Sequence, residues 1–153
     1  MIVEGLQLKN FQCYAGEIAD NTFKFSRGLH LVIGENGSGK SKLWDAFYWV
    51  LYDEIFQSDR REFLKTSIYK DQLISDKAKY ECEVGESVDT LVILTARTSQ
   101  GRIYRVTRAY KATKTEDNSF IGQDRSSVVI EEKKTSRWER LTPDKHDQII
   151  ETI

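Results

Sequence analysis

Eight consecutive residues have the types and spacing that hold a phosphate group: Gly34-Glu35-Asn36-Gly37-Ser38-Gly39-Lys40-Ser41. They match G-x-x-x-x-G-K-[ST], the phosphate-binding loop (P-loop) pattern. Glycines let the backbone turn its N–H groups toward phosphate oxygens, and the dipole of a following helix adds to the anion site. In this pattern Lys40 would reach the β- and γ-phosphates, and the Ser41 hydroxyl would hold Mg²⁺. The sequence therefore predicts a nucleoside triphosphate site with Lys40 as its catalytic residue. The residues assigned to it are Asn36, Gly37, Ser38, Gly39, Lys40, Ser41 and Lys42.

The stretches on either side of this loop must position it, and they have the patterns of a strand and a helix. Gly28 to Ile33 is almost wholly apolar, which predicts a strand covered on both faces of a sheet. Lys42 to Phe56 is apolar around most of its circumference, which predicts a buried helix. Its large aromatic side chains suggest either core or a base-stacking site, and helical core is the favoured interpretation. With strands expected at Met1 to Phe11 and Glu17 to Phe25, residues 1–56 form a P-loop nucleotide-binding core.

The rest of the chain has a different pattern. Residues 59–76 are strongly charged and predict a surface excursion. Beyond them the apolar residues alternate with a period of two, which predicts antiparallel strands. Together, residues 57–141 form the excursion and an antiparallel β-lobe, and Thr142-Pro143-Asp144 begins a helix at 142–153. The predicted strands cover Lys79 to Val84, Val88 to Ala96, Arg102 to Tyr110, Ser127 to Glu132 and Ser136 to Leu141.

Composition narrows the class of protein. The 153 residues include 23 basic and 24 acidic side chains, so any nucleic-acid contact must depend on a local patch. Cys13 and Cys82 are far apart without metal-type spacing, which indicates reduced packing residues in a cytosolic protein. No signal peptide or membrane span is predicted. We therefore expect a cytoplasmic or nucleoid-associated protein with no membrane partner.

One part of a complete ATPase site has no clear match. A P-loop enzyme needs a carboxylate at the end of a second apolar strand, the Walker B position, to serve Mg²⁺ and water. The nearest imitation after the P-loop is Val128-Val129-Ile130-Glu131-Glu132, which is followed by two lysines in an expected hairpin. The sequence therefore predicts half of an ATPase, which is inactive alone.

Three stretches resemble the N-terminal half of SMC-like ABC ATPase heads, the group that includes SMC, SbcC, RecN, RecF and DndD-type proteins. They are Leu8-Lys9-Asn10-Phe11, the segment from Gly28 to Ser41, and the helix segment containing Asp45-Ala46 and Leu51-Tyr52. Tyr104 to Arg108 is similar to the family's lobe strand. Two positions depart from the pattern: Gln12 replaces a common basic residue, and Lys42 replaces a small or neutral one. Lys42 either adds charge near the phosphates or is solvated.

The resemblance implies a fold and a set of partners. The fold class is α/β, an ABC-type half-domain with an antiparallel β-lobe, ending where a coiled coil would begin. ATP and Mg²⁺ would be bound between this P-loop and the signature motif of a second head subunit, so that ATP binding drives dimerisation. The C-terminal half of the same head would supply Walker B. Double-stranded DNA and a nuclease or other effector subunit are further expected partners, in repair, chromosome maintenance or anti-phage defence.

A local basic patch favours the DNA partner. Residues 97–114 contain six basic side chains and no acidic one. Both faces of the second strand carry basic residues, so the period of two does not decide which face is exposed. Residues beside the turns are expected to be exposed in either case, and we assign phosphate contacts to Arg97, Arg102, Lys111 and Lys114. Alternative functions are a nucleotide-dependent clamp without significant hydrolysis and a transporter-type ABC ATPase subunit.

Overall fold

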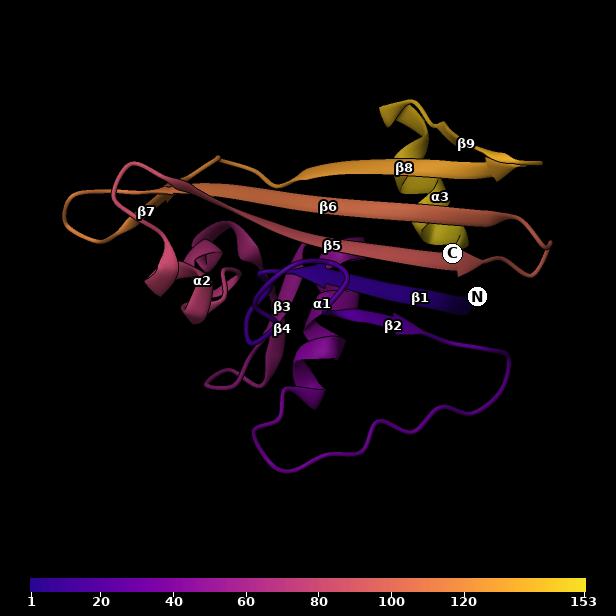
Figure 1. The fold of residues 1–153 in the computed structure, drawn as a ribbon. Helices are drawn as coiled ribbons and strands as arrows, with labels where there is room; N and C mark the ends of the chain where they lie inside the picture. Colours follow the sequence, from indigo (N-terminus) through magenta and orange to yellow (C-terminus); the bar gives the residue numbers. More distant parts are fainter.

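The computed structural model describes residues 1–153 and contains one large antiparallel sheet with a helix packed on one face (Figure 1). The strand order is β2-β1-β5-β6-β8-β9, and β7 pairs with β6. All pairings are antiparallel, which confirms an α/β fold with an antiparallel lobe. The strands of this sheet are β1 (Ile2–Lys9), β2 (Thr22–Lys24), β5 (Ser87–Arg97), β6 (Ile103–Lys114), β7 (Phe120–Gly122), β8 (Ser127–Lys134) and β9 (Arg137–Arg140).

The remaining elements cover the sheet or project from it. A small hairpin, β3 (Glu54–Gln57) with β4 (Glu62–Lys65), follows the P-loop helix. No helix combines the length and apolar character that a membrane crossing needs. The helices are α1 (Lys40–Tyr52), α2 (Asp76–Glu81) and α3 (His146–Thr152), with 3₁₀ turns η1 (Thr66–Ile68), η2 (Lys70–Gln72) and η3 (Pro143–Lys145).

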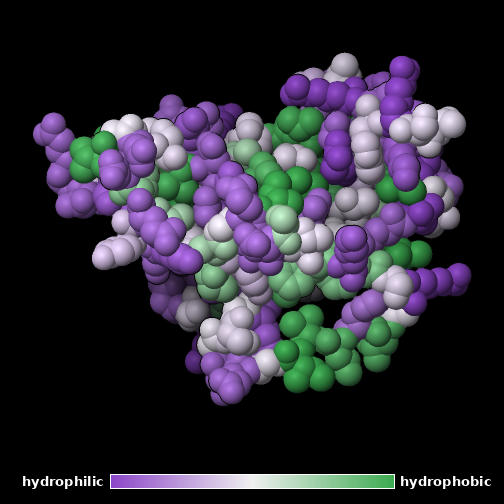
Figure 2. Space-filling model, viewed as in Figure 1, coloured by the Kyte–Doolittle hydropathy of each residue, from purple (hydrophilic) through white to green (hydrophobic).

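The core lies between α1 and one face of the sheet. Trp49 of α1 is fully buried and stacks on Phe11 with ring centroids 5.3 Å apart. Even-numbered residues of β5 and β6, such as Val92 and Val106, are buried on this side, whereas odd-numbered ones are less buried. The opposite sheet face, turned toward the viewer in Figures 1 and 2, is open, as is common for antiparallel sheets.

Side-chain bonds fix α1 at its C-terminal end. The buried guanidinium of Arg108, on β6, donates to the Val50 carbonyl at 3.2 Å and the Leu51 carbonyl at 3.3 Å. These carbonyls belong to the last turn of α1, where a cation also complements the helix dipole. The carboxylate of Asp53 lies 3.9 Å from the same guanidinium. Burial lowers the pKa of Arg108, but a guanidinium remains charged at physiological pH.

Two of the predicted strands are not formed in the structure. Gly28 to Ile33 forms no strand: Leu29 and Ile33 are each 87% exposed, and no backbone of the chain pairs with them. Lys79 to Val84 was predicted as a strand, but α2 occupies Asp76–Glu81. Tertiary contacts override the alternating pattern there, because Ala78 and Cys82, four residues apart, both pack into the core. Lys114 adds to this by donating to two carbonyls at the end of the helix.

Other boundaries are shorter than predicted. The strand predicted over Glu17 to Phe25 is reduced to β2, Thr22–Lys24. The helix predicted to reach Phe56 ends at Tyr52, because Asp53 adopts a left-handed conformation (φ 58°) that turns the chain into β3. A helix begins at the predicted Thr142-Pro143-Asp144, first as a 3₁₀ turn and then as α3.

Candidate nucleotide-binding site

The P-loop connects the unpaired segment 28–33 to the first turn of α1. Gly37 (φ 84°) and Gly39 (φ 89°) have left-handed backbone conformations, which are strained for residues with a Cβ. Packing also requires glycine at position 39, because a Cβ there would lie 2.6 Å from the Cys13 sulfur. At Gly34 a Cβ would lie 2.7 Å from the Ser38 hydroxyl oxygen. The glycine positions are therefore required by the tight course of the loop.

The loop is held against the sheet by the segment that follows β1. The Tyr14 hydroxyl donates to the Gly39 carbonyl at 3.0 Å. Burial raises the pKa of Tyr14 to about 12, so the hydroxyl keeps its proton and remains a donor at neutral pH. Gly39 itself is buried between this segment and α1, although residues 31–38 are exposed. The C-terminal end of the loop is thus fixed to the sheet, whereas its N-terminal end is bonded within the loop, by the Lys40 ammonium and the Ser38 N–H.

The N-terminus of α1 offers anion-binding groups. Gly39 is the N-cap residue, and no side chain caps the first turn of the helix. The Lys42 N–H donates to the Gly39 carbonyl at 2.8 Å, which leaves the N–H groups of Lys40 and Ser41 for phosphate oxygens. The helix dipole favours negative charge there. Ser41 lies on this turn and is exposed, as a Mg²⁺ ligand would need to be. The donor types and their placement fit a nucleotide phosphate chain with Mg²⁺.

The two lysines of the site have different surroundings. The Lys40 ammonium lies across the loop and donates to the carbonyls of Gly34 at 2.7 Å and Glu35 at 2.6 Å. Its charge is therefore over the loop and is balanced by no carboxylate. The Lys42 ammonium instead contacts the buried carboxylate of Asp45 at 2.9 Å. Lys42 was expected to be solvated or to add charge near the phosphates, and in the structure it is half-exposed and ion-paired.

Asp45 was not predicted as part of the site, although it was noted in the family pattern. One carboxylate oxygen accepts from Lys42, and the other accepts from the backbone N–H of Phe56 at 3.0 Å. Asp45 therefore joins the first turns of α1 to strand β3. Its burial at 2% exposure was not evident from the sequence, because it lies among polar residues on the helical pattern.

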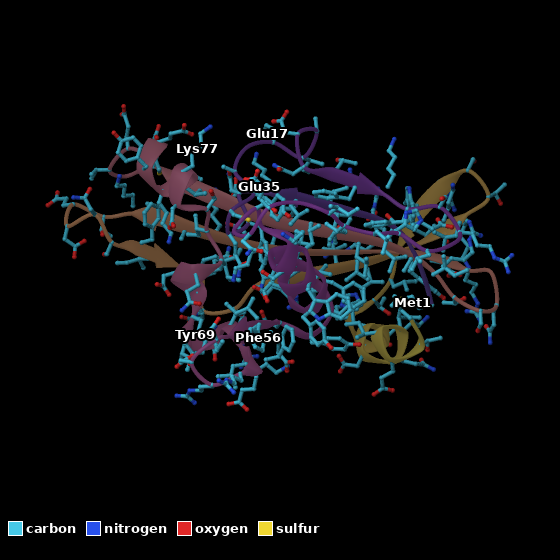
Figure 3. All side chains as sticks on the ribbon, turned by 90° about the horizontal axis from the view of Figure 1, so that it is seen from below. Met1, Glu17, Glu35, Phe56, Tyr69 and Lys77 are labelled. Carbon is cyan, nitrogen blue, oxygen red and sulfur yellow. The ribbon has the colours of Figure 1, made fainter.

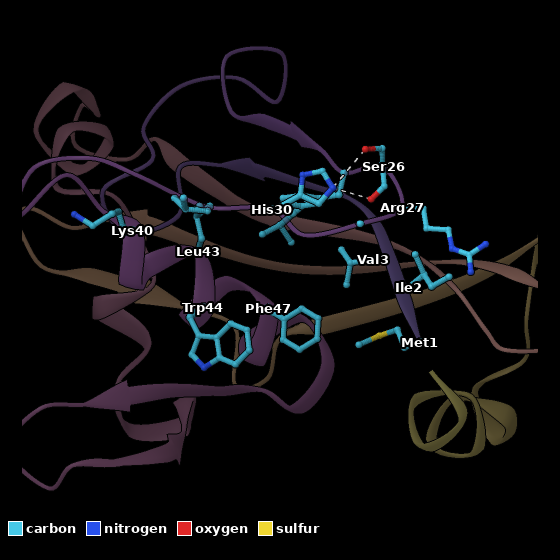
Figure 4. Close-up of a pocket in the computed structure, with 14 residues that line it drawn as sticks. Met1, Ile2, Val3, Ser26, Arg27, His30, Lys40, Leu43, Trp44 and Phe47 are labelled. Atoms are coloured by element: carbon cyan, nitrogen blue, oxygen red, sulfur yellow. Dashed lines mark hydrogen bonds between the residues drawn. The ribbon is translucent and has the colours of Figure 1, made fainter.

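The segment before the loop and α1 together line an apolar cavity of about 670 Å³ (Figure 4). Leu43, Trp44 and Phe47 of α1 form one wall, with Met1 and Ile2 of the N-terminal segment at the far end. Trp44, predicted to be core, is 57% exposed here. Figure 2 shows the apolar side chains of the neighbouring segment as a green ridge below the sheet. Exposed residues of that segment are Leu29, Leu31, Val32 and Ile33.

The four residues assigned to DNA lie at two ends of the sheet. Arg97 and Arg102 flank the β5–β6 turn, whereas Lys111 and Lys114 lie about 30 Å away near α2, at 3.3 Å per residue. Exposure of all four was predicted, and for two this was wrong. The Lys114 ammonium donates to the carbonyls of Lys79 and Cys82 and is partly buried. Arg97 is half-buried and pairs with Glu4 at 2.6 Å.

Two other predicted features can be placed. Glu131 and Glu132, the nearest imitation of Walker B, lie on β8 within the antiparallel sheet. Glu131 pairs with Arg105 at 2.7 Å, and Glu132 pairs with Lys134 at 2.6 Å. Cys13 and Cys82 are both free thiols, and Cys82 is buried as predicted, whereas Cys13 was predicted to be a packing residue and is exposed.

Comparison with known proteins agrees with this geometry. The family model described as "AAA domain" matches residues 5–152, so the chain belongs to this family. Chromosome partition protein Smc of Mycobacterium tuberculosis is 41% identical over 54 residues, which are 35% of this chain and 4% of that protein. The DNA double-strand break repair Rad50 ATPase of Thermoplasma volcanium is 35% identical over 54 residues, covering 35% of this chain and 6% of that protein.

A third relative aligns with a longer part of the chain. Chromosome partition protein Smc of Rhodopirellula baltica is 37% identical over 70 residues, which are 45% of this chain and 6% of that protein. The matches thus span only about a twentieth of the length of these relatives. Together with the family model, they identify the chain as the N-terminal region of an SMC-like ABC ATPase.

Proposed function

We propose that this chain is the ATP-binding N-terminal half of an SMC-like ATPase head, which dimerises on ATP and acts on DNA. The observation that carries the proposal is the P-loop, whose C-terminal end is fixed against the sheet and opens into the uncapped N-terminus of α1. Backbone N–H groups of the loop and helix would bind the phosphate oxygens. Chromosome partition and DNA repair, named for the relatives, are the pathways that fit best, and anti-phage defence is a third.

Different residues of the site would bind different parts of the nucleotide and its metal ion. Lys40 would exchange its bonds to the Gly34 and Glu35 carbonyls for the β- and γ-phosphate oxygens. The Ser41 hydroxyl would hold Mg²⁺, which neutralises charge on the phosphates when it is bound. Asn36 to Gly39 would supply the backbone cradle. Lys42 is held by Asp45 and would contribute positive charge at the edge of the site.

The unpaired segment 28–33 supports the proposal that the head needs a second half. Its residues have strong strand propensity, yet their apolar side chains are exposed and their backbone has no strand partner. A strand from the C-terminal half of the same protein would pair with this segment and cover the cavity beside α1. That half would also bring the Walker B carboxylate. The second head subunit and a nuclease or other effector would assemble on the completed head.

Substitution of the P-loop lysine in the complete protein tests the proposal. Lys40→Ala removes the ammonium charge that would contact the β- and γ-phosphates. We therefore expect ATP binding and ATP-dependent activity to fall by about 100-fold. Lys145→Ala, which removes a lysine exposed in η3, is the matched control and should have no effect. Normal ATP binding by the Lys40 variant would contradict the P-loop assignment.

Two further measurements separate an ATPase from a clamp. The 153-residue chain alone should hydrolyse ATP negligibly, whereas the complete protein should turn over ATP and do so faster with DNA. Substantial turnover by the chain alone would point to a carboxylate within it, with Glu131 and Glu132 tested first. ATP-dependent dimerisation without turnover in the complete protein would instead favour a nucleotide-dependent clamp.

A further inference from the structure

A polar pocket of about 310 Å³ lies at the C-terminal end of α1, at the opposite end of that helix from the P-loop. The 13 residues of α1 separate the two sites by about 20 Å along the helix axis. Figure 3 shows Tyr69, which precedes Lys70 of the pocket, well apart from Glu35 of the P-loop. The lining residues come from four parts of the chain, which are Asp53 after α1, the segment 65–73, Tyr110 of β6 and residues 124–126.

Hydrogen bonds between these parts hold the walls of the pocket in place. One oxygen of the Asp53 carboxylate accepts from the Thr66 hydroxyl at 2.6 Å and from the Ser126 hydroxyl at 3.2 Å. The other oxygen lies 3.9 Å from the buried guanidinium of Arg108, which also donates to the Ser126 hydroxyl at 2.9 Å. The negative charge of Asp53 is therefore neutralised within the wall, and a ligand would meet a preformed site.

Two cations of the lining are not neutralised by carboxylates. The Lys70 ammonium donates to two backbone carbonyls, at 3.0 and 2.5 Å, and Arg125 is exposed. Neither side chain has a carboxylate within 4.0 Å, whereas the third cation, Lys65, pairs with Glu54 at 3.1 Å. Asp124 is the one carboxylate of the lining that has no cationic partner. Positive charge therefore exceeds negative charge at the pocket, which favours an anion.

Tyr110 supplies an unused hydrogen-bond donor among the lining residues. Its side chain is buried, at 4% exposure, and its hydroxyl has no hydrogen-bond partner although the oxygen is not fully enclosed. Gly122 leaves room for this hydroxyl, because a Cβ there would overlap the oxygen. Burial, and to a smaller extent the charge of Asp71, raise the pKa of Tyr110, so the hydroxyl keeps its proton at neutral pH. A buried hydroxyl without a partner is unfavourable, and an acceptor oxygen of a ligand would satisfy it.

We propose that this pocket binds a small phosphate, either inorganic phosphate or the phosphate group of a small monoester. A phosphate group presents several acceptor oxygens at once, which the Tyr110 hydroxyl, the Lys70 ammonium and the Arg125 guanidinium can share. The exposed Ser67 hydroxyl is a further donor at the pocket. A metal cation is disfavoured, because the two unneutralised cations would repel it. The pocket shares no residue with the P-loop, so it is a site separate from that of the nucleotide.

Phosphate binding by the complete protein carrying Lys40→Ala tests the proposal, because this substitution removes the P-loop lysine that would also bind phosphate. Titration calorimetry should show saturable binding of inorganic phosphate or of glycerol 3-phosphate to this variant. In the same background, Arg125→Gln and Tyr110→Phe should each weaken the binding by about 10-fold, since each removes a hydrogen bond to a charged group. The matched controls Arg60→Gln and Tyr80→Phe change an exposed arginine and an exposed tyrosine outside the pocket and should leave the affinity unchanged.

The outcomes separate this pocket from the nucleotide site. Weaker binding in the Arg125 and Tyr110 variants, with both controls unchanged, supports the pocket, and the tighter of the two ligands identifies the source of the phosphate. Absence of saturable binding, or equal affinity in all variants, would overturn the pocket and leave the P-loop assignment intact. Because Arg125 is exposed, its variant decides the question even if Tyr110→Phe disturbs folding. ATP binding should be unchanged when Arg125→Gln or Tyr110→Phe is made with Lys40 in place.

Discussion

Two apolar stretches of the sequence, β5 and residues 28–33, differ in burial and in strand pairing. In β5, Val92 and Leu94 are fully buried, and the strand is paired on both sides by β1 and β6. In the segment 28–33, Leu29 and Ile33 are 87% exposed, and the backbone has no strand beside it. The difference lies in the availability of a partner strand, because a strand is stabilised by its neighbours more than by its own propensity. The incomplete region is the one that leads into the P-loop.

The contrast predicts that stability resides in the sheet and α1. Trp49→Ala should have the largest effect, lowering the free energy of unfolding of the chain by about 3–5 kcal/mol, because it leaves a cavity beside Phe11. Denaturant unfolding measures this. Trp49→Phe is the control and should cost much less, since it keeps the ring contact and removes an indole N–H that has no hydrogen-bond partner. A small loss in the alanine variant would mean that α1 is not part of the core.

The link between the sheet and α1 should have the next largest effect. Arg108→Met leaves the Val50 and Leu51 carbonyls without their donor, so we expect a loss of about 2 kcal/mol in denaturant unfolding. Arg108→Lys retains the charge but not the forked donor geometry and should recover part of the loss. Equal stability of the Met variant and the unsubstituted chain would contradict this role.

Asp45 should have a somewhat smaller effect at the other end of α1. Asp45→Ala removes the acceptor for the Phe56 N–H and the partner of Lys42, at an expected cost of about 1–2 kcal/mol. Asp45→Asn keeps an acceptor for the N–H and should cost less. Thermal unfolding of the two variants distinguishes the hydrogen bond from the ion pair, and identical losses would assign the whole effect to the charge.

The smallest effect is predicted in the unpaired segment. Val92→Thr places a hydroxyl in the core and should cost about 1–3 kcal/mol, whereas the same change at the half-exposed Val32 should cost less than about 0.5 kcal/mol in the chain alone. In the complete protein the Val32 variant should become as costly as a core substitution. If the two variants were equally destabilised in the chain alone, segment 28–33 would already be packed.

Sequence patterns predicted the elements that are stabilised within the chain. The α1 helix, the β5–β6 hairpin and the helix after Thr142 follow from local periodicity and turn residues, and the family follows from the P-loop and its flanks. Contacts between distant residues are what the patterns could not predict. Ala78 and Cys82 pack as a helical face in α2, and the Lys114 ammonium binds backbone carbonyls at the end of that helix. Alternation also left the faces of β6 unresolved, because Arg108 is a buried cation among apolar neighbours.

Amide hydrogen exchange over residues 29–33 tests most directly whether this chain is half of a nucleotide-binding head. In the 153-residue chain these amides have no strand partner, so they should exchange at close to the unstructured rate, while those of β5 are protected. In the complete protein with ATP and Mg²⁺, the same five residues should become protected as a partner strand pairs with them. If they exchange equally fast in both, no second half completes the strand that leads into the P-loop, and the account is contradicted.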